Sequence, residues 1–133
     1  MPTKSTVRKA KEDLREGKKP STAAGEFVKE EIDHVRQGKH GARSPQQAIA
    51  IGLNEARRAG IPLPPPRRGR TSAKTRKSAA RAYEKGQSGA KKTSRKRSRA
   101  RERALEREPR NTVSRKALSR HARSAARRRR SRR

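Results

Sequence analysis

The sequence contains no cysteine and no tryptophan, and its aromatic residues are limited to Phe27 and Tyr83. The absence of cysteine excludes disulfide scaffolds, cysteine-ligated zinc sites and thiol catalysis. No apolar run approaches the roughly 20 residues that a membrane-spanning helix needs. The basic start of the chain is not followed by the apolar stretch of a secretory signal, so we expect neither a signal peptide nor a membrane span.

Hydrophobic residues are also scarce, at 26% of the 133 residues, whereas cations are abundant. Lys and Arg number 41 against 12 acidic residues, which gives a net charge of +29. A chain of this composition cannot bury a large apolar core. Its self-repulsion would be relieved by a polyanion, and nucleic acid is the most abundant polyanion in a cell. Anionic membranes and acidic proteins are the competing partners.

Charge and apolar residues are divided unevenly along the chain. Residues 1–66 carry a net charge of +5 and most of the large apolar side chains, whereas residues 67–133, the basic half, carry +24. We therefore predict a mostly α-helical protein in three parts. Residues 1–61 form a small module of about three short helices, and residues 62–70 form a proline-rich spacer. Residues 71–133 form a basic arm with up to three short helices, partly disordered or helical only on its partner.

Two helices are predicted from the helix start and stop signals in the first 40 residues. The first covers about residues 5–16 and stops at Gly17. The second is capped by Ser21 or Thr22 and ends before Gly38, with Phe27 on its apolar face.

The third predicted helix has the clearest start signal. Ser44 is a good N-cap, Pro45 fits the first helical position, and Gln47 completes a capping box. Gly60 marks the end of the helix, and Ile61 is placed to fold back onto its last turn.

Small residues form a seam along this third helix. Ala48, Gly52 and Ala56 recur at every fourth position, which would let another helix approach closely. None of the three is chemically reactive, so we predict helix packing, either within the chain or in a homodimer through the module.

The proline-rich segment follows at residues 62–66. Consecutive prolines favour a polyproline II spacer. A ligand for proline-recognising domains is the alternative interpretation.

Three segments of the basic half begin alike, at residues 71–74, 93–96 and 112–116. Each starts with a hydroxyl residue that can cap a helix rich in Ala, Arg and Lys. Gly86, Gly89 and Pro109 separate the segments, and no apolar stripe joins them. We expect separate short helices.

Cations of the basic half are the predicted contacts to phosphate. If about eight phosphates were neutralised, the slope of log affinity against log salt would be roughly −7. The candidate residues are Arg67, Arg68, Arg70, Lys74, Arg76, Lys77, Lys91, Lys92, Arg95, Lys96, Arg97, Arg99, Arg101, Arg103, Arg115, Lys116, Arg120, Arg123, Arg127, Arg128, Arg129 and Arg130.

The scarcity of aromatic residues favours double-stranded over single-stranded partners, because single-strand binders stack bases on aromatic rings. No zinc-finger spacing, RNP motif or basic-zipper heptad is present. We therefore predict nonspecific binding to duplex DNA by a histone-like, nucleoid-associated protein of the cytoplasm. Structured RNA or the ribosome is the second candidate partner. A membrane-active cationic protein and a stress protein whose charge serves solubility are further alternatives.

Catalysis is not indicated by any motif. The chain has no glycine-rich phosphate loop and no nucleophile beside a base. Glu30 and His34 are spaced as half of a helical metal site, but no second ligand pair is evident. We predict a non-enzymatic protein without metal, cofactor or small-molecule substrate.

The GKHGARS segment at residues 38–44, followed by QAIAIGLNEARRAG at residues 47–60, resembles an uncharacterised family of small, basic bacterial proteins classed as a domain of unknown function. The stretches at residues 21–35 and 118–127 are also similar to that family. The resemblance implies a bacterial origin and no established activity.

Overall fold

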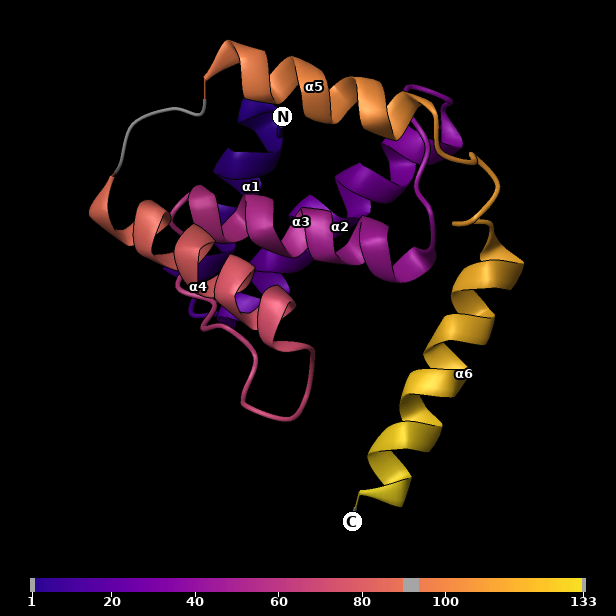
Figure 1. Cartoon of the computed structure of the whole chain (residues 1–133). Coiled ribbons are helices and arrows are strands. Elements are labelled where there is room, and N and C mark those ends of the chain that lie inside the picture. Colours follow the sequence, from indigo (N-terminus) through magenta and orange to yellow (C-terminus); the bar gives the residue numbers. More distant parts are fainter. Residues whose placement is uncertain (1, 90–93, 133) are drawn as a thin grey trace. The chain divides into compact units, whose positions relative to one another are not determined.

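The computed structural model describes residues 2–89 and 94–132 and confirms the predicted mostly α-helical protein (Figure 1). In these residues no β-strand is found, and Arg68 and Thr71 form an isolated bridge. No helix of the described chain is both long and apolar enough to cross a membrane. The helices are α1 (Lys4–Arg15), α2 (Pro20–Arg36), α3 (Pro45–Arg58), α4 (Ala73–Ser88), α5 (Arg95–Glu106) and α6 (Arg115–Ser131).

The first two helices follow local signals, with one correction. Thr3 caps α1 by accepting a hydrogen bond from the Thr6 amide at 3.2 Å, and the chain turns at Gly17 with φ of +83°. Helix α2 begins at Pro20, ahead of the predicted caps Ser21 and Thr22. Proline is well tolerated there because the first helical amides have no partner within the helix.

Helix α3 starts and ends as the sequence predicts. The Ser44 hydroxyl accepts from the Gln47 amide at 3.2 Å, and the Gln47 side chain accepts from the Arg43 amide at 2.5 Å. Gly60 has φ of +97°, and the Ile61 amide donates to the Ala56 carbonyl at 3.1 Å. Ile61 is fully buried, so the segment after α3 folds back onto it.

The three similar segments of the basic half also begin helices. Ser72, Ser94 and Ser114 are the N-caps of α4, α5 and α6, and each accepts a hydrogen bond from the amide three residues later. Thr93, at the start of the second segment, lies outside the described residues.

The described chain forms two compact units, each built from separate stretches of sequence. The first unit comprises residues 2–31 and 50–89, with α1, α4, most of α2 and most of α3. The second unit comprises residues 32–49 and 94–132, with the end of α2, the start of α3, α5 and α6.

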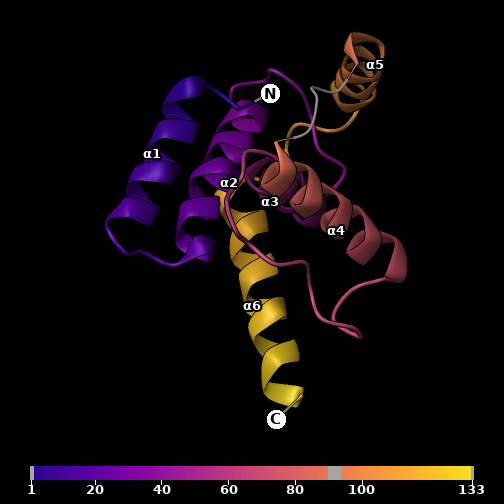
Figure 2. The same ribbon diagram turned by 90° about the vertical axis from the view of Figure 1, so that its left-hand side faces the viewer.

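The core of the first unit consists mainly of small residues around one aromatic ring. Val7 and Leu14 of α1 pack against it, and Figure 2 shows α1 lying alongside α2. A core of this size fits the low hydrophobic content of the chain. Its buried members are Ala10, Ala23, Ala24, Phe27, Ala56 and Ile61.

Arg57 fastens the proline-rich segment to α3 within the first unit. Arg57 is 5% exposed, and its guanidinium donates to the carbonyls of Leu63 and Pro64, both at 3.1 Å, and to Asn54 Oδ1 at 3.0 Å. Burial lowers the pKa of Arg57. Helix α4 comes close at the same point, because a Cβ on Gly86 would lie 1.7 Å from the Arg57 carbonyl oxygen.

The second unit has a separate, smaller core. Val35, Ala42, Ala48 and Val113 are buried together, and Ile32 and Leu118 pack against them. Residues 32–49 and the start of α6 are thereby joined by apolar contact.

Candidate nucleic-acid interface

The loop between α2 and α3, residues 38–43, is bound by the segment that joins α5 to α6. The Gly41 amide donates to the Leu105 carbonyl at 2.8 Å, and the Ala42 amide donates to the Pro109 carbonyl at 2.9 Å. The Thr112 hydroxyl donates to the Ala42 carbonyl at 2.7 Å. These bonds hold two basic stretches of the second unit side by side.

Two arginines add bonds across the same junction. Arg110 Nε donates to the Gly38 carbonyl at 3.2 Å, and Arg36 Nε donates to the Val113 carbonyl at 3.0 Å. Gly41 is required at the closest approach, because a Cβ there would lie 1.9 Å from the Glu108 carbonyl oxygen. The junction therefore depends on backbone contacts that a larger residue at position 41 would break.

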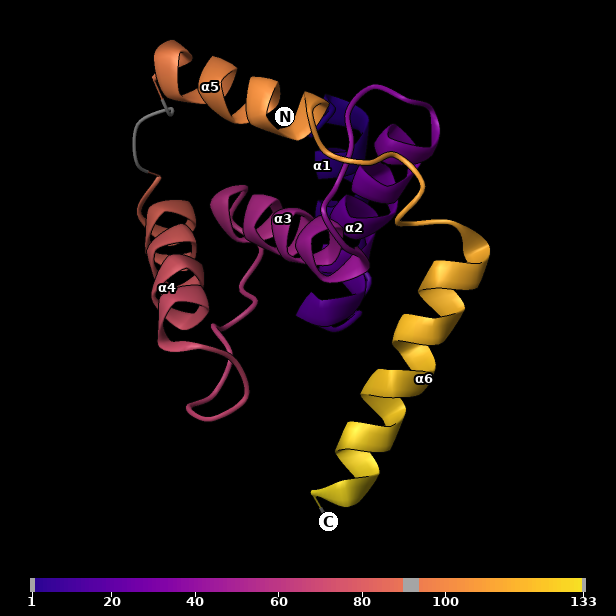
Figure 3. The same ribbon diagram turned by 45° about the vertical axis from the view of Figure 1, so that its right-hand side comes forward.

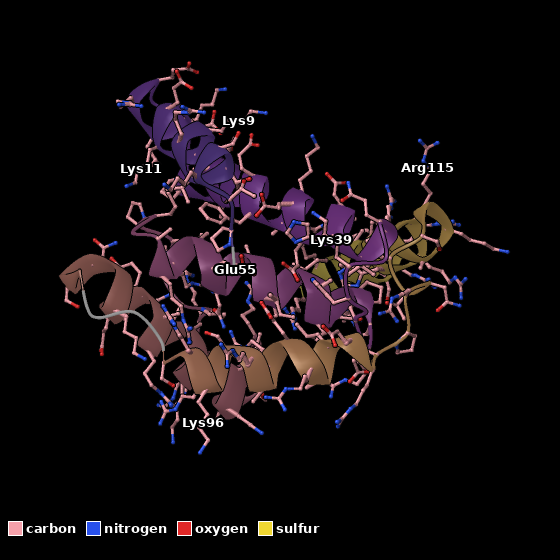
Figure 4. All side chains as sticks on the ribbon, turned by 90° about the horizontal axis from the view of Figure 1, so that it is seen from above. Lys9, Lys11, Lys39, Glu55, Lys96 and Arg115 are labelled. Atoms are coloured by element: carbon pink, nitrogen blue, oxygen red, sulfur yellow. The ribbon has the colours of Figure 1, made fainter. Side chains whose placement is uncertain are left out.

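The exposed side chains of this junction are cationic. Lys39 and Arg43 of the loop are exposed, as are Arg115 and Lys116 at the start of α6. Figure 4 shows Arg115 pointing away from the ribbon. The sequence analysis assigned no role to Lys39 and Arg43, although the two glycines that bracket Lys39 signal a constrained loop.

Helix starts in the basic half add to the positive potential. None of α4, α5 and α6 has an acidic residue in its first turn. Arg95 and Lys96 open α5, and Arg115 and Lys116 open α6. Because the amino end of a helix already carries partial positive charge, these starts attract anions through both the backbone and the side chains.

The predicted phosphate contacts are shared between the two units. Those from Arg67 to Lys77 lie before and on α4 in the first unit, exposed except for the half-buried Arg76. Those from Arg95 to Arg130 lie on α5 and α6 in the second unit and are exposed. Lys91 and Lys92 lie outside the described residues.

These cations are not neutralised by the described part of the chain. No Lys or Arg among the described residues 67–89 and 94–132 forms a salt bridge with another described residue. By contrast, Lys18 in the first unit lies 3.2 Å from Asp13 and 3.3 Å from Glu16. The cations of the described part of the basic half are therefore available to an external anion.

Helix α6 has little to hold it beyond its first turns. It contains no fully buried residue, and Leu118 is its contact with the core of the second unit. Figure 3 shows it as a single extended helix. Arg and Lys four residues apart repel each other, which weakens a free helix.

The small-residue seam of α3 is covered by side chains of the same chain. Ala56 belongs to the core of the first unit, and Ala48 to that of the second. Gly52 is buried against α2 in the first unit, where a Cβ would lie 2.7 Å from Val28 Cα.

An acidic pair that the sequence analysis missed lies in the first unit. Burial, together with the charge and hydrogen bond of Glu31, raises the pKa of the Glu55 carboxyl to about 8. Glu31 itself is 3% exposed. Glu55 lies on α3 and is half-buried (Figure 4). Glu55 therefore keeps its proton at neutral pH.

Glu30, one of the two residues spaced as half of a metal site, is hydrogen-bonded to the start of α1. Glu30 accepts hydrogen bonds from the Thr3 amide at 3.0 Å, from the Thr3 hydroxyl at 2.7 Å and from the Thr6 hydroxyl. It therefore anchors α1 to α2. His34 and His40 of the second unit lie edge to face, with ring centroids 6.1 Å apart. Glu31, His34 and His40 each offer one possible ligand atom, and these atoms all lie within 4.8 Å of one another.

A comparison with family models matches residues 3–68 to a family described as "Family of unknown function (DUF6496)". No curated protein and no solved structure matches the chain.

Proposed function

The chain belongs, through residues 3–68, to the DUF6496 family of unknown function, and we propose that it binds duplex nucleic acid nonspecifically through phosphate contacts. One observation carries this proposal: the exposed cations on α4, α5 and α6 have no salt-bridge partner among the described residues. The function is binding rather than catalysis, and its site of action is the nucleoid.

The energetic source of binding is the release of counterions from the phosphate backbone. Each Lys or Arg that neutralises a phosphate releases condensed cations. The slope of log affinity against log salt therefore becomes more negative by about 0.9 for each phosphate contact. This contribution is independent of base sequence. The cationic starts of α5 and α6 fit phosphate oxygens, which also accept from free helix amides.

A duplex is favoured over a single strand because neither aromatic ring is free to stack on bases. Phe27 is fully buried, and Tyr83 is half-buried on α4. Single-strand binders obtain about 1–3 kcal/mol per base from aromatic stacking. DNA is favoured over folded RNA by this proposal, and the comparison of the two ligands is part of its test.

Helix α6 is proposed to be stabilised by its ligand. Phosphates would relieve the repulsion between cations one turn apart, which opposes the helix in the free protein. Circular dichroism of the full chain should therefore show a more negative signal at 222 nm on addition of duplex. An unchanged signal would contradict this part of the proposal.

The contacts of α5 can be tested with charge-matched variants of the full chain. The test variant replaces Arg97, Arg99 and Arg103 of α5 by Gln. The control replaces three exposed lysines of the first unit, at positions 9, 19 and 29, by Gln. Each lost phosphate contact should lower the salt slope by about 1.

We expect the α5 variant to reduce the slope by about 3 and the control by less than 1. The salt slopes of both variants are measured by fluorescence anisotropy on a labelled random-sequence duplex and on a folded RNA of similar length. Equal effects of the two variants would mean that only net charge matters. Tighter binding to the RNA at equal salt would assign the protein to structured RNA.

A further inference from the structure

Helix α1 carries a row of cations along one side. Lys4, Arg8, Lys11 and Arg15 are all exposed and are spaced by three or four residues. At about 1.5 Å per residue, they extend over roughly 16 Å of the helix axis. None of these four residues belongs to the phosphate contacts predicted from the sequence.

The other sides of α1 have different partners. Val7, Ala10 and Leu14 face the core of the first unit. Asp13 pairs with Lys18, as does Glu16 just beyond the helix. Among the described residues none of the four cations of the row forms a salt bridge. Asp13 and Glu16 are thus neutralised, whereas the row and the exposed Glu12 of α1 form no salt bridge among the described residues.

The row also borders a hollow in the surface. An open groove of about 350 Å³ runs along α1, with both aliphatic and cationic walls. Its lining residues are Pro2, Lys4, Val7, Arg8, Lys11 and Arg15. Pro2 and Val7 are its apolar side chains, and the other four lining residues are the cations of the row.

We propose that this row, named here the α1 row, is a second surface for the sugar-phosphate backbone, located within the family-matched residues. The proposal rests on the proposed function and adds a contact outside the basic half. One DNA strand presents a charge about every 3.4 Å along the duplex axis, so the row spans about five phosphates. The match of charge and length favours a nucleic-acid backbone over a membrane, which would need a wide apolar face.

The row is held in place by the packing already described. The Glu30 carboxylate accepts hydrogen bonds from Thr3 and Thr6 at the start of α1. Cations three or four residues apart repel each other and weaken the helix. An anion bound along the row removes this repulsion, so binding should also stabilise α1.

Lysine footprinting of the full wild-type chain tests the proposal with a control on the same helix. Lys4 and Lys11 belong to the row, whereas Lys9 points to another side of α1 (Figure 4). Acetylation rates are measured by mass spectrometry with and without a random-sequence DNA duplex. We expect several-fold protection of Lys4 and Lys11, with little change at Lys9.

The same experiment separates this proposal from the proposed function. Protection of Lys74, Lys96 and Lys116 without protection of Lys4 and Lys11 would overturn the α1 row and leave the proposed function standing. Protection of no lysine would overturn both. Protection of Lys4 and Lys11 by poly-glutamate but not by duplex would assign the row to acidic protein and overturn the proposal.

A variant in which neutral side chains replace three cations of the α1 row provides a second readout. Replacing Arg8, Lys11 and Arg15 by Gln should reduce the magnitude of the salt slope on duplex by about 2–3. The control variant, with Gln at positions 9, 19 and 29, should reduce it by less than 1. Circular dichroism should show α-helix content at least equal to that of the wild type. A slope equal to that of the wild type, in a folded variant, would overturn the proposal.

Discussion

Two glycines in neighbouring helices should respond in opposite directions to substitution by alanine. Gly52 of α3 is buried, and a Cβ there would lie 2.7 Å from Val28 Cα and 2.9 Å from Val28 N. Gly25 of α2 is exposed, and a Cβ there would meet nothing within 4 Å. The two positions share helical backbone and differ in the space around them.

The expected magnitudes follow from that difference. Alanine is favoured over glycine by about 1 kcal/mol in a helix interior, so Gly25→Ala should stabilise the first unit by about 0.5–1 kcal/mol. Gly52→Ala receives the same gain, but overpacking against a backbone that cannot rotate away costs about 1–3 kcal/mol or more. We expect a net loss of about 1–2 kcal/mol and a difference of about 2–3 kcal/mol between the variants.

Urea unfolding measures both variants by the fluorescence of Tyr83. This residue is the only tyrosine in a chain without tryptophan, and it lies on α4 in the first unit, so the signal reports that unit. A Gly52→Ala variant as stable as the wild type would refute the close approach of α3 to α2. Equal shifts for the two variants would show that helix propensity alone decides the outcome.

Two further substitutions test the junction and the acidic pair. Gly41→Ala places a Cβ against the Glu108 carbonyl, so the Ala42 amide should lose at least about tenfold of its hydrogen-exchange protection, whereas amides of α1 should keep theirs. For Glu55, the folded state holds the proton up to about pH 8, whereas the unfolded chain releases it near 4.5. The free energy of unfolding should therefore fall as pH rises from about 5 to 8, by at most about 1.4 kcal/mol per pH unit. Glu55→Gln should flatten this dependence in urea titrations, and an equally steep slope in the variant would contradict the assignment.

Features set by neighbouring residues could be predicted from the sequence. Ser114 caps α6 because its hydroxyl reaches the amide three residues later, and Gly60 ends α3 because its backbone adopts a positive φ. Both interactions are complete within one turn of chain. The start of α2 was misplaced because Pro20 and Ser21 are both acceptable at a helix start.

Features that depend on distant contacts could not be predicted. The junction of residues 38–43 with residues 105–113 uses backbone amides and carbonyls, which every sequence provides. Similarly, the raised pKa of Glu55 depends on burial beside Glu31, which is 24 residues away in sequence. The spacing of Lys4, Arg8, Lys11 and Arg15 is visible in the sequence, but their shared exposure along α1 appears only with the fold.

The most direct test of the proposed function is the salt dependence of wild-type binding to two duplexes of unrelated sequence. Nonspecific contact with about eight phosphates predicts a common log–log slope of roughly −7 and affinities within a few-fold of each other. A slope shallower than about −2 would contradict phosphate-driven binding. A strong preference for one of the two sequences would show that bases, rather than the backbone, are being read.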